Sequence, residues 1–272
     1  MKVFLMTDME GVSGAAVFSA YGLPPNPQIA GVLRLMMKEI NAAIEGCFDG
    51  GATEVIVHEA HGFEMAAIDP RASIVRGGNL INTLNSSFDA MLFVGQHAMS
   101  LTPDGVLAHT ASSRSIVEVK INGESAGELA VFGAVAGHYG VPVVFVSGDT
   151  AGCREAKALF GDLETAEVMH GLGNHSAICL SNAKACELIR AGAARSLSRI
   201  NALPPLRYAA PIVMEIRLKA PALADTFCLI PGVERVDSTT VRVESDNYLD
   251  VFKVGYLCLG LVLNRWDRNA GH

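Results

Sequence analysis

The chain has 272 residues, of which 50% are hydrophobic and 18% charged, so it is long enough to bury a substantial core as one large domain or as one domain with an added lobe. A formal net charge of −7 and the lack of any run of Lys or Arg argue against a nucleic-acid partner, because affinity for phosphates depends on clustered cations. The six cysteines form no CxxC pair, which argues against a disulfide scaffold and a zinc finger.

The N-terminus is typical of a buried first strand and not of a secretory signal. Only four apolar residues, at 3–6, separate Lys2 from Thr7 and Asp8, whereas the apolar region of a signal peptide needs about seven to fifteen. Scattered cysteines without a pairing pattern suit a reducing compartment. We therefore expect a cytoplasmic protein.

Strand-like apolar runs then alternate with helix-like segments. The expected strands are 3–7, 54–58, 72–75, 90–95, 115–121 and 141–147. The expected helices are 30–48, which follows a Gly/Pro-rich loop at 22–27, and 127–139, 151–160 and 181–198. This alternation predicts an α/β fold with three layers, α/β/α, around a mainly parallel sheet.

The pair Pro204-Pro205 marks the expected domain boundary. We expect an α/β domain over residues 1–203 and, packed on it, a small α+β lobe over residues 204–272. Its strand, helix, strand and helix are expected at 209–218, 222–229, 235–243 and 248–266. The apolar run at 254–263 has only ten residues, about half of what a membrane span needs, so we expect a buried helix and no membrane partner.

Side chains of the kind that bind metals follow three of the expected strands. Asp8 and Glu10 come after the first strand, His61 after the strand that ends at His58, and His97 after the strand at 90–95. The carboxyl ends of parallel strands meet at one edge of a sheet. If these strands are parallel neighbours, the four side chains meet there.

Asp8 and Glu10 project to the same side of an extended segment, because they stand two residues apart. Two close carboxylates repel each other unless a cation or a proton intervenes, and a pair of divalent metal ions would resolve this. The ordinary alternative is a capping Asp and a solvated Glu. We favour His61 over His58 as a ligand because Gly62 lets the backbone turn there, and we expect His58 to be packed or to support the site.

Two later residues are further candidates. His109 lies in a loop of small residues and is a candidate acid, base or oxyanion stabiliser, although it could equally tether the loop. Glu128 lies at the start of the helix expected at 127–139, where a carboxylate also interacts well with the helix dipole. The chain has no GxGxxG, GxSxG or HExxH motif, so nucleotide binding and serine-hydrolase chemistry have no support.

Several short motifs occur in a fixed order along nearly the whole chain. They are TDMEGVSG at 7–14, EVIV at 54–57 leading to His61, LFVGQHA at 92–98, GVLAH at 105–109, ING at 121–123, GEL at 127–129, VAGHYGVPV at 135–143, SGD at 147–149 and STTV at 238–241. As a set they resemble the zinc-dependent D-aminopeptidase family of the dipeptide-operon (DppA) type.

The resemblance implies a metallo-aminopeptidase with two Zn²⁺ ions per subunit, held by Asp8, Glu10, His61, His97 and Glu128. It also implies a catalytic role for His109. Mn or Co would suit the same mixture of carboxylate and imidazole ligands. Members of the family act on short peptides with an N-terminal D-residue, such as D-Ala-D-Ala. They form homo-oligomeric rings, typically a decamer of two stacked pentamers.

The sequence departs from the family pattern at four places. Glu59 stands where the family usually has Asp, Ala66 where it has Asn, and residues 18–29 lack a Tyr-x-x-Gly-Arg stretch. The region at 174–176 carries no Arg. We expect these positions to affect the support of the ligands and the grip on the substrate.

Three functions therefore stand side by side. Hydrolysis of the N-terminal residue of a short peptide is the expected one. A metal-dependent amidase or carboxypeptidase-like hydrolase of cell-wall peptide fragments is the alternative that the departures suggest, and a non-catalytic dipeptide-binding protein is the third. Substrate stereochemistry, the native metal, the role of His109 and the ring size are not fixed by the sequence.

Overall fold

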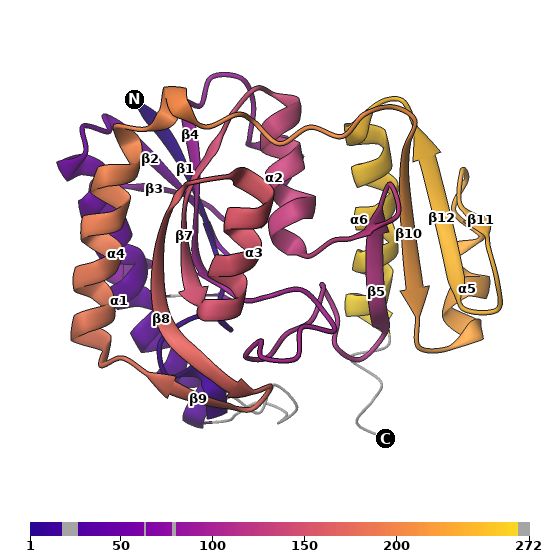
Figure 1. The fold of residues 1–272 in the computed structure, drawn as a ribbon, viewed down its shortest axis with the longest axis horizontal. Helices are drawn as coiled ribbons and strands as arrows, with labels where there is room; N and C mark the ends of the chain where they lie inside the picture. The colour runs from indigo at the N-terminus through magenta and orange to yellow at the C-terminus, as the bar shows by residue number, and fades with distance from the viewer. Residues whose placement is uncertain (18–26, 63, 78–79, 266–272) are drawn as a thin grey trace.

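The structure is a computed structural model that describes residues 1–17, 27–62, 64–77 and 80–265 (Figure 1). Most of the loop expected at 22–27, and residue 266 of the last expected helix, lie outside the described residues. No helix in the described ranges is long and apolar enough to span a membrane.

The larger sheet has seven strands in the order β3-β2-β1-β4-β7-β8-β9. These are β1 (Lys2–Thr7), β2 (Glu54–His58), β3 (Ser73–Val75), β4 (Ala90–Gln96), β7 (Val143–Asp149), β8 (Glu164–Gly173) and β9 (Ser176–Cys179). All neighbours pair in parallel except β8 and β9, which form an antiparallel pair. The expected mainly parallel sheet is therefore confirmed.

Helices cover both faces of this sheet (Figure 1). One face carries α1 (Pro27–Asp49) and α4 (Asn182–Leu197), and the other carries α2 (Glu128–His138) and α3 (Thr150–Phe160). Strands β4 and β7 are buried along their whole length, which explains why they are continuously apolar in the sequence. The three-layer α/β/α prediction is confirmed.

The long helix α1 buries one stripe of side chains against the sheet. Met36, Ile40, Ile44 and Cys47 are each fully buried, and their spacing of three or four residues places them on one face of a helix. Gly46 lies where α1 crosses α4, and a Cβ atom there would collide with the backbone oxygen of Arg190. This small residue lets the two helices approach closely.

A second, smaller sheet has the order β11-β12-β10-β5-β6. Its strands are β5 (Ile116–Ile121), β6 (Glu124–Ser125), β10 (Ile212–Leu218), β11 (Glu234–Arg235) and β12 (Thr240–Ser245). The short helix α5 (Pro221–Phe227) follows β10, and α6 (Tyr248–Arg265) lies between this sheet and α2 (Figure 1).

The smaller sheet takes strands from both sides of the expected boundary. β5 pairs with β10 in antiparallel fashion, although its residues fall within the expected domain at 1–203. β5 has the mixed burial of a strand with one covered face, unlike β4 and β7. The division at residue 204 stays a prediction, and the chain visits the smaller sheet once before reaching that point.

The strand order brings the ends of three strands together. β1 lies between β2 and β4 and pairs in parallel with both, so the segments that follow these strands leave from the same edge of the sheet. The turn after β1 lies on the end of β4, because Asp8 N donates to Val94 O at 2.9 Å and Gly11 N donates to Gly95 O at 2.7 Å. Gly95 has a φ of +77° and touches the Asp8 backbone, where a side chain would not fit.

Candidate metal centre

The five side chains that the resemblance identifies as ligands lie together at this edge. Asp8 and Glu10 occupy the turn after β1, His61 follows β2, His97 follows β4 directly, and Glu128 is the first residue of α2. The convergence expected from parallel neighbouring strands is therefore present in the structure.

Asp8 lies in the middle of the group. Its Oδ1 is 2.9 Å from His61 Nε2 and its Oδ2 is 3.4 Å from His97 Nε2. Glu10 Oε2 lies 3.2 Å from His61 Nε2, and Glu128 Oε1 lies 3.5 Å from His97 Nε2. One carboxylate thus faces two imidazoles, and each imidazole also faces a second carboxylate.

Two sets of possible ligand atoms are close enough to hold a cation. The atoms of Asp8, Glu10 and His97 lie within 4.8 Å of one another, and so do those of His97, His109 and Glu128. His97 belongs to both sets. His109, for which the resemblance implies a catalytic role, is thus within reach of the same centre.

The electrostatics of the cluster call for positive charge. Burial and the neighbouring Glu10 raise the pKa of Asp8 to about 7. Burial also acts to raise the pKa of Glu128, but the charge of His97 outweighs this effect and lowers the pKa to about 2. Asp8 and Glu10 are buried and Glu128 is partly buried, so the three carboxylates need cations or protons beside them to lie this close together.

The two imidazoles respond in the opposite sense. Burial disfavours their charged forms, but the carboxylates hold the pKa of His61 and His97 well above the usual range. Glu10 Oε2 is buried and makes no regular hydrogen bond in the described part of the chain, although His61 Nε2 lies 3.2 Å away. A donor set of carboxylates and imidazoles fits a divalent metal ion of the zinc type.

Backbone carbonyls orient the buried imidazole of His97 and the partly buried imidazole of His109. His97 Nδ1 lies 2.9 Å from Ala98 O, and His109 Nδ1 lies 2.8 Å from Leu107 O. A carbonyl oxygen can only accept, so each Nδ1 carries the hydrogen. Nε2 of His97 consequently faces Asp8 and Glu128, which is the arrangement of a metal-binding histidine whose other nitrogen is held by the protein.

His109 lies against His97 in a strained loop. The two rings stack with centroids 4.1 Å apart and an interplanar angle of 12°, and burial and the charge of His97 lower the pKa of His109. Leu107 and Ala111 have φ values of 51° and 60°, a conformation that L-residues seldom adopt and that concentrates at functional sites.

This loop is tied down from two sides. Ala111 N donates to Glu128 Oε1 at 2.8 Å, and Leu107 N donates to the Asn174 carbonyl at 2.8 Å. Asn174 belongs to the region where the sequence departs from the family pattern, and it connects the β8–β9 hairpin to the loop of His109. Because the backbone of residue 174 makes this contact, the effect of the missing Arg side chain stays a prediction.

The other flagged residues lie around the centre. His58 is partly buried with its ring 6.1 Å from that of Phe4, and its nitrogens have no hydrogen-bond partner among the described residues; it is a packed residue. Glu59 pairs with Arg76 Nε at 3.0 Å. Ala66 lies in a short 3-10 helix. Residues 18–26 of the departure at 18–29 lie outside the described ranges.

Sequence reasoning missed Gln96. Its Nε2 donates to Asp8 Oδ2 at 3.0 Å, and the residue is only 1% exposed. It is the last residue of β4 and directly precedes His97, and a polar residue at the end of an otherwise apolar strand was the available signal.

We expect Gln96→Leu to weaken zinc binding by about 10- to 100-fold, the usual effect of removing a group that orients a ligand. The Leu side chain keeps the size of the residue but leaves Asp8 Oδ2 without its donor. Competitive titration with a chromophoric chelator measures the affinity. The variant for comparison is Gln96→Glu, which keeps the shape of the side chain but replaces the amide donor by a carboxylate. Unchanged affinity in the Leu variant would contradict the role of Gln96.

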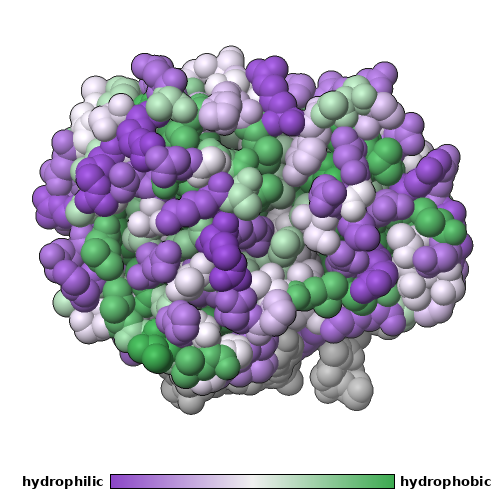
Figure 2. All heavy atoms as spheres, viewed as in Figure 1, coloured by the Kyte–Doolittle hydropathy of each residue, from purple (hydrophilic) through white to green (hydrophobic). Residues whose placement is uncertain are grey.

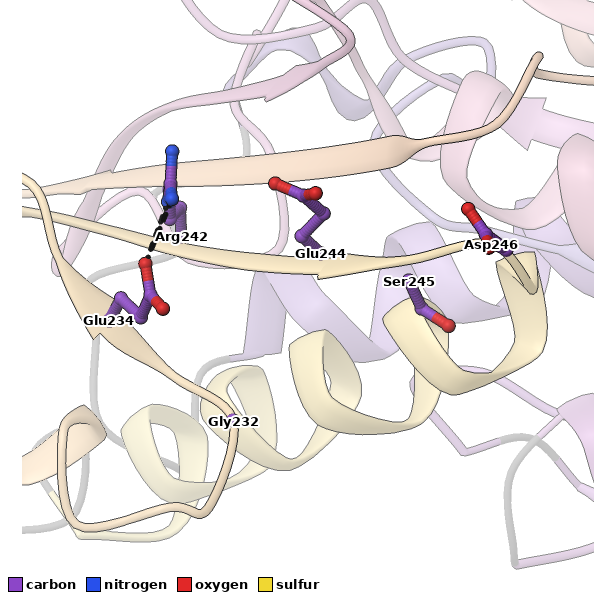
Figure 3. A pocket seen from close by; sticks show the side chains of 6 residues that line it. All are labelled: Gly232, Glu234, Arg242, Glu244, Ser245 and Asp246. Carbon is purple, nitrogen blue, oxygen red and sulfur yellow. Dashed lines mark hydrogen bonds and ion pairs between the residues drawn. The ribbon is translucent and has the colours of Figure 1, made fainter.

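A pocket elsewhere in the molecule contains none of the residues of the metal centre. It measures about 450 Å³ and lies on the smaller sheet, lined by Gly232, Glu234, Arg242, Glu244, Ser245 and Asp246 (Figure 3). Arg242 is paired with Glu234 at 2.9 Å. Among the described residues, the groups of side chains that could hold a metal ion lie at the edge of the larger sheet.

Comparisons with known proteins agree with this geometry. A family profile described as D-aminopeptidase matches residues 1–256. A curated D-aminopeptidase from Bacillus subtilis (strain 168) is 30% identical over 262 residues, which cover 93% of this chain and 94% of that protein. Among solved structures, the Zn-dependent D-aminopeptidase DppA from Bacillus subtilis, a self-compartmentalizing protease, matches with a TM-score of 0.89 and 28% identity, covering 97% of this chain and 98% of that one.

Proposed function

The chain belongs to the D-aminopeptidase family, and from this premise we propose that it is a zinc-dependent aminopeptidase that holds two metal ions on Asp8, Glu10, His61, His97 and Glu128. The proposed substrates are short peptides with an N-terminal D-residue. The ligand set, the number of ions and the substrate class are parts of the proposal, whereas the assignment to a family of metal-dependent aminopeptidases follows from the comparisons.

The position of Asp8 between two imidazoles is the observation that carries the proposal. With its two oxygens 2.9 Å from His61 and 3.4 Å from His97, Asp8 would hold the metal ions together with the two histidines and the two glutamates. Two divalent ions outweigh three carboxylates by one charge, which favours an anionic nucleophile or the carboxylate of a peptide.

Bound zinc would act as a Lewis acid that polarises the scissile carbonyl and makes water a better nucleophile at neutral pH. The protein would supply the proton transfer. Because His109 Nδ1 donates to Leu107 O, its Nε2 carries a lone pair that can accept a proton and pass it to the leaving amine. This geometry favours proton transfer over oxyanion stabilisation, which would need a hydrogen on Nε2.

Removal of the metal is the first test. Dialysis against a chelator is expected to abolish hydrolysis of a D-Ala-D-Ala dipeptide, and added zinc is expected to restore it fully at two equivalents per chain. A parallel series of L-Ala-L-Ala, mixed dipeptides and cell-wall peptide fragments identifies the substrate class. Full activity at one equivalent would contradict the two-metal centre, and turnover of the cell-wall fragments alone would contradict the aminopeptidase assignment.

We also propose that the protein works as a homo-oligomer. The relative DppA is a self-compartmentalizing protease, and an apolar patch lies over the β8–β9 hairpin of this chain (Figure 2). Leu172 and Ile178 in this hairpin are each 62% exposed, and exposed apolar patches mark association surfaces. Sedimentation or mass photometry would give the size of the assembly.

A further inference from the structure

Glu39 is a buried carboxyl group that the proposed chemistry does not use. It lies in the middle of α1 with 0% of its surface exposed. Its Oε1 accepts from Ser13 N at 3.0 Å and from Asn182 Nδ2 at 3.4 Å. Its Oε2 has no hydrogen-bond partner among the described residues. Burying a carboxyl group without a full set of hydrogen bonds costs stability.

The contacts of Glu39 join α1, α4 and the turn that follows β1. Ser13 is three residues after Glu10, and its hydroxyl also donates to Leu180 O at 2.6 Å, just before α4. Asn182 Nδ2 lies 3.4 Å from Leu35 O as well. The start of the same turn is held by the bond from Asp8 N to Val94 O. The two carboxylates of the centre therefore stand between two anchored points.

The protonation state of Glu39 matters because of its surroundings. Burial raises the pKa of Glu39 to about 8, so the carboxyl is neutral at pH 7. The titratable group of α4 near Glu39 is the Cys186 thiol, and burial and the charge of Glu39 raise the pKa of this thiol. Lys38, the residue before Glu39 on α1, is exposed. No ion pair in the described part of the chain involves Glu39. If ionised, Oε2 would carry charge without a donor among the described residues, which makes the packed arrangement around it less stable.

We propose that Glu39 is a positioning residue: by accepting from Ser13 N and from Asn182 Nδ2 it holds the turn that presents Asp8 and Glu10 against α1 and α4. Ionisation of Glu39 is expected to loosen that turn, because a charged Oε2 has no donor among the described residues. The test of this role by enzymatic activity rests on the proposed aminopeptidase function. The other readouts, zinc affinity and hydrogen exchange, do not.

Two substitutions separate the roles of the group. Glu39→Gln keeps an acceptor for Ser13 N and cannot ionise, so it is expected to retain activity at pH 7 and to keep it as the pH rises through about 8, where wild type declines. Glu39→Leu fills the same space without an acceptor and is expected to lower zinc affinity and kcat/KM by about 10- to 100-fold at pH 7. Glu45→Gln makes the same change on the same helix at an exposed carboxylate that pairs with Arg190, and should follow the wild-type profile.

Hydrogen exchange of the amides at 11–14 provides the direct measurement. In wild type their protection is expected to fall as Glu39 ionises, and in Glu39→Gln it is expected to stay constant over the same range. The Tm difference between the two proteins should grow with pH up to about 8 and then level off, because the folded state binds a proton that the unfolded state has released above its ordinary pKa of 4.5.

Identical pH profiles of activity, zinc affinity and exchange in wild type and Glu39→Gln would overturn the proposal, and so would full zinc affinity in Glu39→Leu. If zinc-loaded wild type hydrolyses no peptide while zinc affinity and exchange respond to Glu39 as described, the aminopeptidase proposal fails and the positioning role stands.

Discussion

Replacing His97 by Ala is expected to lower kcat/KM by at least about 10³-fold, equivalent to about 4 kcal/mol of lost transition-state stabilisation, and to reduce the bound zinc below two equivalents per chain. His97 is the one residue common to both sets of possible ligand atoms. Its loss therefore removes a proposed ligand together with the imidazole that faces both Asp8 and Glu128, whereas loss of Glu10 or Glu128 removes one carboxylate.

The structure also indicates why the remaining residues cannot compensate. His97 is only 3% exposed. Its Nε2 lies 3.4 Å from Asp8 Oδ2, which also accepts a hydrogen bond from the neutral amide of Gln96. With Ala at this position the three carboxylates would face each other across a small polar gap. The pKa of Asp8, already raised by burial and Glu10, would rise further, and a protonated Asp8 is a poor ligand.

Zinc content by elemental analysis and steady-state kinetics on one dipeptide check this prediction together. His138→Ala is the matched control, because His138 is an exposed residue at the opposite end of the helix that begins with Glu128. His61→Ala and Glu128→Ala are expected to lose metal and activity together as well. Two equivalents of zinc and unchanged kinetics in all three site variants would remove the proposed ligand set.

Replacing His109 by Ala is expected to lower kcat by about 10²- to 10⁴-fold, the usual contribution of a general acid or base, while the zinc content stays unchanged. The reason is the orientation of the ring: Leu107 O holds Nδ1 at 2.8 Å, and Nε2 remains available for proton transfer. The substrate should still bind, so KM is expected to change less than kcat.

The two histidine variants can be told apart by their metal content. His109 lies within 4.8 Å of possible ligand atoms of His97 and Glu128, so a fall in zinc content in His109→Ala would identify it as a ligand and contradict a purely catalytic role. A substrate whose leaving group needs no proton, such as a nitrophenyl ester, should lose much less activity in this variant than a dipeptide does.

Much of the site could be predicted from the sequence because parallel strands impose a simple rule. Asp8, Glu10, His61 and His97 all follow buried apolar strands, and in a parallel sheet the segments that leave neighbouring strands share one edge. The sequence alone left open whether these strands are neighbours. The structure shows that β1 lies between β2 and β4 and pairs in parallel with both. These four residues needed only strand positions and parallel pairing.

Glu128 and Glu39 were beyond that rule. Glu128 is preceded by β5 and β6, which belong to the other sheet, so its approach to His97 depends on how two sheets pack; only the family resemblance indicated it. Glu39 had no distinguishing feature in the pattern of α1, because its contacts reach Ser13 and Asn182, 26 and 143 residues away. Contacts of such long range are set by tertiary packing, which periodicity does not encode.

The path of the chain between His109 and Glu128 has a further consequence. The polypeptide leaves the loop of His109, runs through β5 and β6, and returns to begin α2 at Glu128, while β5 is bonded along its length to β10. A protein shortened before β10 would thus lose the partner of the strand that spaces these two residues. The C-terminal quarter of the chain therefore supports the metal centre through β10. Removing this part of the protein should abolish activity even though every proposed ligand would still be present.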